Sequence, residues 1–272
     1  MNPTVLEWLN LFVRWFHVFA GIMWVGQTYY FTWLDGQFGK LEKSAAAGET
    51  APQLWMVHSG GFYAVEKQRT LGVAPGQVHW FRWEALMTWV SGMILLILIY
   101  YLGGALIDTD VANISVGLGV VIGLGVLAIG WIIYDVAARS PVGKSEIGFA
   151  AFSIVAIALL AWGLSHVFSG RAAYIHVGAL LGTIMTLNVW MRILPAQRKM
   201  IAASAAGAKF DAALGARAKL RSKHNTFMAV PAVFIMLSNH FPSATYGNSH
   251  GWVVLVALIL LGWAAAKIIR DA

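Results

Sequence analysis

Long apolar segments alternate with shorter polar segments along most of this chain. A membrane-spanning helix needs roughly 20 mostly apolar residues, and seven segments approach or reach that length. They are about Trp15–Leu34, Glu84–Leu102, Val111–Tyr134, Ile147–His166, Ala172–Leu194, Asn225–His240 and Gly251–Ile269. The sixth is the shortest and contains Pro231. The pattern predicts an all-α integral membrane protein with about seven transmembrane helices, and a single membrane domain over residues 1–272.

The composition supports a membrane protein. Hydrophobic residues make up 59% of the chain and charged residues only 11%, whereas a soluble domain is about one quarter charged. The absence of cysteine excludes disulfides, iron–sulfur clusters and covalently attached haem. The net charge of +7 does not predict nucleic-acid binding, because the basic residues lie between spans. The N-terminus lacks a basic signal region, so we expect the first span to be retained.

Lysine and arginine concentrate in the polar segments that follow the first, third and fifth predicted spans. The segments after the second and sixth spans contain neither residue, and the segment after the fourth contains only Arg171. Basic residues are enriched on the cytoplasmic side of membrane proteins. This asymmetry predicts an N-terminus outside the cytoplasm, which is periplasmic if the protein is bacterial, and a cytoplasmic C-terminus.

Two of the cytoplasmic segments have a character of their own. Residues 35–82 are predicted to form a loop that contains a short hairpin over Trp55–Tyr63, turning at Gly60–Gly61, which could cap a site. Residues 196–222 are rich in alanine, lysine and arginine, which predicts an amphipathic segment on the membrane surface.

Four histidines recur in register. His17 and His176 each lie near the start of an apolar span, and His79 and His224 each lie at the foot of the following span. This predicts a pseudo-repeat of helix pairs, spans 1–2 and 5–6. Imidazoles near both membrane faces suit one or two haem b groups. We predict that His17 pairs with His176 and His79 with His224 as iron ligands, with His240 as the leading substitute.

Arginines close to these histidines are candidates for binding the haem propionates. Three of them are three residues from a histidine, a spacing that places both side chains on one helical face, and Arg171 is five residues before His176. The four arginines are Arg14, Arg82, Arg171 and Arg221. Taken singly, an interfacial histidine equally suits a polar cap at a helix end, and it is the joint recurrence that favours a cofactor.

Further polar groups lie within or beside the spans. Glu84 begins the second span and is a candidate catalytic base or proton relay, with His58 in the loop as the other candidate base. Glu84 equally suits an interfacial acid paired with Arg82 or Arg192. Asp135 ends the third span, and ionisable residues inside spans are usually functional.

Several stretches resemble the membrane domain of the bacterial membrane-bound urate oxidase (urate hydroxylase) family. They are Val57–Tyr63, His79–Ala85, Gly182–Val189, Arg221–Met228 and Pro231–His240. The resemblance runs from about Trp15 to Trp263. It implies oxidation of urate to 5-hydroxyisourate in the inner membrane, with electrons passed to a cytochrome c or another respiratory acceptor. Members typically carry a C-terminal cytochrome c domain, which these cysteine-free residues lack.

Other functions remain open at this stage. A transporter for a purine-like anion would suit the pseudo-repeat. A haem-bearing electron-transfer subunit of a respiratory complex would use the same histidines without turning over a substrate. A zinc or copper site could be built from the outer histidines, although few acids lie near them. The sequence is also compatible with a homo-oligomer.

Overall fold

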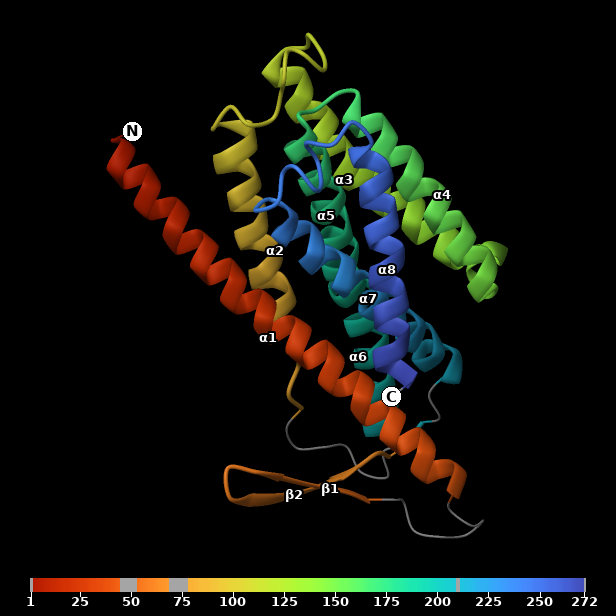
Figure 1. Cartoon of the computed structure of the whole chain (residues 1–272). Coiled ribbons are helices and arrows are strands. Elements are labelled where there is room, and N and C mark those ends of the chain that lie inside the picture. Colours follow the sequence, from red (N-terminus) through yellow and green to blue (C-terminus); the bar gives the residue numbers. More distant parts are fainter. Residues whose placement is uncertain (1, 45–52, 69–77, 209–210, 272) are drawn as a thin grey trace.

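The computed structural model describes residues 2–44, 53–68, 78–208 and 211–271. It is a bundle of helices with one small hairpin at one end (Figure 1). The helices are α1 (Pro3–Ser44), α2 (Trp83–Leu96), α3 (Val116–Arg139), α4 (Glu146–Ser165), α5 (Gly170–Leu187), α6 (Leu194–Ala205), α7 (Ala212–Ser238) and α8 (Gly251–Asp271). A π-helical turn, Ile97–Tyr101, extends α2, and a second, Asn188–Ile193, joins α5 to α6 without a break.

Six helical segments in the described part of the chain are long and apolar enough to cross a membrane. They are α1, α2 with its π turn, α3, α4, the continuous α5–α6 helix and α8. This confirms an all-α protein of the multi-pass membrane type. The predicted sixth span corresponds to α7, which begins at Ala212 instead of Asn225. Its added first half is charged but remains helical, because alanine, leucine, lysine and arginine favour helix.

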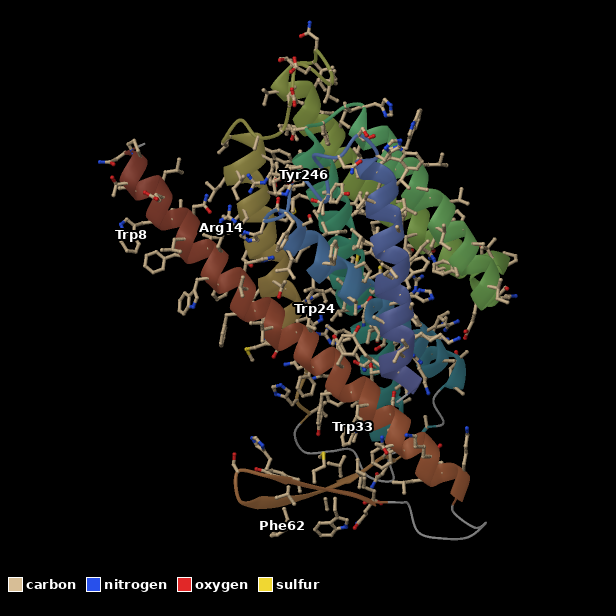
Figure 2. All side chains as sticks on the ribbon, viewed as in Figure 1. Trp8, Arg14, Trp24, Trp33, Phe62 and Tyr246 are labelled. Carbon is tan, nitrogen blue, oxygen red and sulfur yellow. The ribbon has the colours of Figure 1, made fainter. Side chains whose placement is uncertain are left out.

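The first helix is much longer than the predicted span Trp15–Leu34. It runs from Pro3 to Ser44 and therefore includes the first part of the predicted loop 35–82. It crosses the outside of the bundle diagonally, with α2 beside its middle (Figure 1). Only 6% of its most apolar stretch is buried. Figure 2 shows Trp8 on the outward side of this helix and Trp24 on the side of the bundle.

The hairpin consists of β1 (Gln53–His58) and β2 (Gly61–Glu66), which pair antiparallel from Gln53 opposite Glu66 to His58 opposite Gly61. Its turn is Ser59–Gly60, one residue earlier than predicted. Both turn residues have positive φ, 52° and 76°, which is the geometry of a type I′ turn. The hairpin lies below the C-terminal half of α1 (Figure 1). Lys67, which follows β2, pairs with Asp35 of that half.

The predicted amphipathic segment 196–222 is not one element. The α6 helix ends at Ala205 and is followed by Gly207, whose φ of +65° stops the helix. The α7 helix then begins at Ala212, where the Asp211 side chain accepts a hydrogen bond from the backbone N–H of Ala213. A glycine and an N-cap aspartate therefore divide the segment into two helices.

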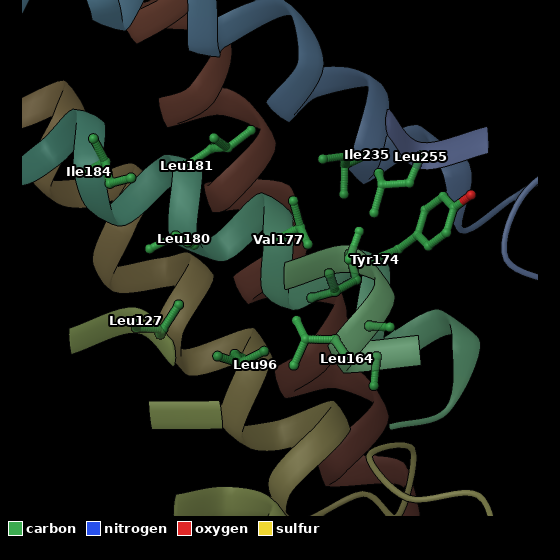
Figure 3. Close-up of a cluster of buried hydrophobic side chains, with 14 of the residues drawn as sticks. Leu96, Leu127, Leu164, Tyr174, Val177, Leu180, Leu181, Ile184, Ile235 and Leu255 are labelled. Atoms are coloured by element: carbon green, nitrogen blue, oxygen red, sulfur yellow. The ribbon is translucent and has the colours of Figure 1, made fainter. Parts of the chain in front are cut away.

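The α5 helix lies at the centre of the bundle and contacts α2, α3, α4, α7 and α8. Figure 3 shows its buried side chains meeting those of the surrounding helices. These include Val177, Leu180, Leu181 and Ile184 of α5 with Leu96, Leu127, Leu164, Ile235 and Leu255. A side chain carried by α5 or by the π turn that follows it is therefore held from several sides.

Candidate functional site

A buried ionic cluster lies where α3 ends beside the second π turn. The Asp135 carboxylate is 4% exposed and pairs with three guanidinium groups. Arg192 contacts both carboxylate oxygens, while Arg221 and Arg139 approach at 2.8 and 2.7 Å. One carboxylate against three guanidinium groups leaves an excess of positive charge. A buried acid of this kind is stable only because it is paired this thoroughly.

A chain of hydrogen bonds leads from this cluster to a histidine. Arg221 donates to Asn188 Oδ1 at 3.4 Å, and Asn188 Nδ2 donates to the Tyr134 hydroxyl at 2.8 Å. The same Tyr134 oxygen lies 2.8 Å from His224 Nδ1. Asn188 Nδ2 also donates to Asn225 Oδ1 at 2.9 Å, so the Asn188 side chain is hydrogen-bonded to α7 as well as to α3. The position of the His224 imidazole is therefore tied to α3, α5 and α7 together.

His224 lies at one end of a large cavity between α3, α4, α5, α7 and α8. The cavity volume is about 900 Å³. Its walls are mainly apolar, and the imidazole stacks on the Phe149 ring at 4.5 Å between centroids. Lys223, Lys267 and Arg270 line it as well. Glu146 also lines it and pairs with Lys223. The cavity thus combines apolar walls, one imidazole and two further cationic side chains, Lys267 and Arg270, which suits a flat amphiphilic anion.

His176 is sealed in the core. Its Nδ1 lies 2.8 Å from the carbonyl oxygen of Ala172, which can only accept, so Nδ1 carries the proton. Its Nε2 then accepts from the Tyr101 hydroxyl at 3.2 Å. A Cβ atom at Gly123 would lie 2.7 Å from that nitrogen, so α3 approaches the ring as closely as only glycine allows.

His17 joins α1 to α2. Its Nδ1 donates to the carbonyl oxygen of Thr88 at 2.9 Å and lies 3.0 Å from Ser91 Oγ. Its ring packs against Gly92. The α2 residues that His17 contacts therefore lie at least nine residues, or roughly 13 Å of helix, before the Tyr101 that holds His176. The two imidazoles have different neighbours, and their pairing around a haem stays a prediction.

The other candidate histidines are exposed. His79 lies edge-on to Phe81 at 4.6 Å between centroids, His240 follows the end of α7 and His58 ends β1. None of the three lines the cavity beside His224. The proposed pairing of His79 with His224 and the role of His58 as a base therefore also stay predictions.

Three of the four candidate arginines already have polar partners. Arg14 donates to Asn10 on the same helix, Arg171 donates to Asn239 at 2.8 Å, and Arg221 belongs to the Asp135 cluster. Figure 2 shows Arg14 on α1 towards α2. None of them lines the cavity. The cations there come instead from α7 and α8. Lys267 and Arg270 do not stand out in the sequence, because the end of a span commonly carries basic residues.

Arg82 and Glu84 differ from the rest. Arg82 Nε and Glu84 Oε2 are buried without a hydrogen-bond partner, and so is Nε1 of Trp190. The Arg82 guanidinium lies over the rings of Trp83 and Trp190, at 5.3 and 5.7 Å from their centroids. The predicted pairing of Glu84 with Arg192 is not formed, because Arg192 pairs with Asp135.

A metal site of the zinc type has no support in the described ranges. No group of three or more histidine, aspartate or glutamate side chains there could hold a metal ion. A haem site is not subject to this test, because one or two imidazoles suffice for its iron.

These features define a multi-pass helical membrane protein with a buried charged network and imidazoles held in fixed orientations. A family model described as urate oxidase N-terminal matches residues 3–270. The chain therefore belongs to this family, which confirms the resemblance found in the sequence and supports a urate-related oxidoreductase. No curated protein and no solved structure matches the chain.

Proposed function

We propose that this protein is a haem b oxidoreductase of the bacterial inner membrane that oxidises urate to 5-hydroxyisourate. The family membership supports urate as the substrate. The structural observation that carries the haem assignment is His224 at the cationic end of the apolar cavity. The electron acceptor in this proposal is a cytochrome c or another respiratory carrier.

The residues around the cavity fit haem b. The cavity volume of about 900 Å³ lies within the usual range of roughly 300–1,000 Å³ for ligand pockets. The His224 imidazole would hold the iron, and Lys267 and Arg270 would pair with the propionates. Lys223 already pairs with Glu146. The iron would supply reversible one-electron acceptance. His17 and His176 remain the candidates for a second haem.

The surrounding residues orient the imidazole. A ligand imidazole usually has its second nitrogen held by a hydrogen bond, which sets the ring orientation. Here the Tyr134 hydroxyl occupies Nδ1 of His224, and Asn188 in turn holds Tyr134. The Phe149 ring stacked on His224 leaves the imidazole little freedom to rotate. With iron at Nε2, the Nδ1–H would donate to the Tyr134 oxygen, which also accepts from Asn188 Nδ2.

The proposed reaction balances with water as the oxygen source. Urate and one water give 5-hydroxyisourate, two protons and two electrons, with a new C–O bond formed at the ring carbon C5. The electrons leave one at a time, so two molecules of a cytochrome c would be reduced for each urate. A carboxylate such as Glu84 would accept a proton from the attacking water.

The first test is a reduced-minus-oxidised visible spectrum of the purified protein with a pyridine haemochrome count. We expect a b-type α-band that urate elicits under anaerobic conditions, and a loss of bound haem in His224→Ala. His166→Ala is the matched control, because His166 is exposed and its Nδ1 bonds to Trp162 within its own helix. A colourless wild-type protein would contradict the proposal.

A further inference from the structure

Unpartnered polar atoms gather at the start of α2, away from the cavity beside His224. Four buried side-chain nitrogen or oxygen atoms lack a hydrogen-bond partner in the described part of the chain. Three of them belong to Arg82, Glu84 and Trp190. Buried polar groups are nearly always hydrogen-bonded, so a group of three without partners requires an explanation.

Arg82 and Trp190 meet at an aromatic enclosure with Trp83, and Glu84 follows Trp83 in sequence. The rings of Trp83 and Trp190 meet edge to face, with 5.7 Å between centroids and 70° between planes. The Arg82 guanidinium lies within 6 Å of both ring centroids, at 5.3 and 5.7 Å. Glu84 follows in the first turn of α2. Donors and aromatic faces are therefore combined at one place, and an acceptor follows within the first turn of the same helix.

We propose that this enclosure, formed by Arg82, Trp83, Glu84 and Trp190, binds a planar purine anion, and that the anion is urate. The assignment rests on the proposed function for the identity of the substrate. A purine anion of this class offers carbonyl oxygens to Arg82 Nε and Trp190 Nε1, and ring N–H groups to the Glu84 carboxylate. Its flat face suits stacking on an indole ring.

The electrostatics of the enclosure favour an anion despite Glu84. Arg82 contributes a positive charge and occupies the N-cap position of α2. The free backbone N–H groups at a helix N-terminus add partial positive charge there. Glu84 then distinguishes ligands that carry ring N–H donors from those that do not, because a buried carboxylate left unpaired is costly.

The second π turn connects the enclosure to the cavity. Trp190 belongs to the turn Asn188–Ile193, and so does Asn188, which holds Tyr134 and through it His224. Ala85, next to Glu84, is buried against Val189 of the same turn. Short π segments frequently occur at functional sites, and here the turn positions one residue for each site.

The test is calorimetric titration of urate into the full chain in lipid nanodiscs, which detects binding without any redox readout. We expect Arg82→Gln and Glu84→Gln each to weaken the Kd at least about ten-fold, as for the loss of a hydrogen bond to a charged group. Trp190→Phe keeps the stacking face and removes only the N–H, so a smaller loss of about three- to ten-fold is expected. Arg217→Gln is the control, because that side chain is 66% exposed, forms only a surface pair with Asp211 and lies outside both the enclosure and the Asp135 cluster.

A second ligand and a fold control complete the experiment. Xanthine, which is largely uncharged at neutral pH, should bind more weakly than urate to the wild type and lose less affinity on Arg82→Gln. Circular dichroism establishes that each variant is folded. Wild-type affinity in both folded variants Arg82→Gln and Glu84→Gln, or no urate binding by the wild type, would overturn the site. Absence of haem would sink the proposed function but leave the binding result unaffected.

Discussion

At the scale of single residues, Asp135 is held by three ion pairs. Its carboxylate is 4% exposed and neutralises part of the charge of Arg139, Arg192 and Arg221. Arg221 is itself only 6% exposed. A partner removed from such a cluster leaves a buried charge uncompensated, and that penalty exceeds the value of the pair itself.

We therefore expect Asp135→Asn to lower the free energy of unfolding by about 3–5 kcal/mol. The measurement is thermal or denaturant unfolding in a fixed detergent. Asp35→Asn is the matched control, because it removes an exposed pair with Lys67, in which the side chains are 51% and 38% exposed, and such pairs contribute up to about 1 kcal/mol. Equal effects of the two substitutions would show that the cluster is not a stabilising element.

At the scale of helices, close approach depends on small residues at the contacts. Helices in a membrane associate through packing and polar contacts, because the lipid removes the hydrophobic drive between them. The contact between α7 and α8 shows this, since a Cβ atom at Gly262 of α8 would lie 2.9 Å from Cδ of Pro231 in α7. Pro231 lies inside α7 and cannot yield easily, because its ring is rigid.

We expect Gly262→Ala to destabilise the protein by about 1–3 kcal/mol through overpacking, although alanine favours helix. Gly163→Ala on α4 is the control, because a Cβ there meets no atom within 4 Å and helix propensity alone then favours alanine. Unfolding curves of the two variants should shift in opposite directions. A shift of the same sign in both would contradict the close approach of α7 and α8.

At the scale of the whole molecule, the two ends of the bundle differ in kind. The hairpin and the C-terminus lie at one end, and the N-terminus lies at the other (Figure 1). Basic residues flank the sites in sequence. Arg139 and Lys144 follow Asp135, and Lys219 and Lys223 precede His224. The positive-inside rule then predicts that the hairpin end faces the cytoplasm.

The cysteine-free sequence makes this orientation directly testable. Ser59 in the hairpin turn and Ser249 in the segment before α8 are both exposed, so each can be replaced by cysteine. We expect a membrane-impermeant maleimide to label Ser249→Cys in cells with a permeabilised outer membrane, and Ser59→Cys only after the inner membrane is opened. The wild type provides the unlabelled background, and the reverse pattern would invert the topology.

The sequence by itself determined the class of the protein and most of its helices. The spans could be recognised because each depends on the local density of apolar residues, as in α3, α4 and α8. Helix ends were predicted less well, because Pro3–Ser44 and Ala212–Ser238 continue through polar residues that favour helix as strongly as apolar ones. The family could be recognised from short stretches of sequence without any knowledge of contacts.

Only the tertiary structure decided which polar groups meet. Asp135 and Arg221 are 86 residues apart in sequence, and Tyr134 and His224 are 90 residues apart. Arginine and histidine spacing within one helix indicated the face on which each side chain lies, but the partner belongs to another helix. Hydrogen bonds and ion pairs act over only a few ångströms, so the partner depends on how closely the helices approach and how they are rotated. Glycine contacts such as Gly123 set the approach, and the π turn Asn188–Ile193 sets the rotation.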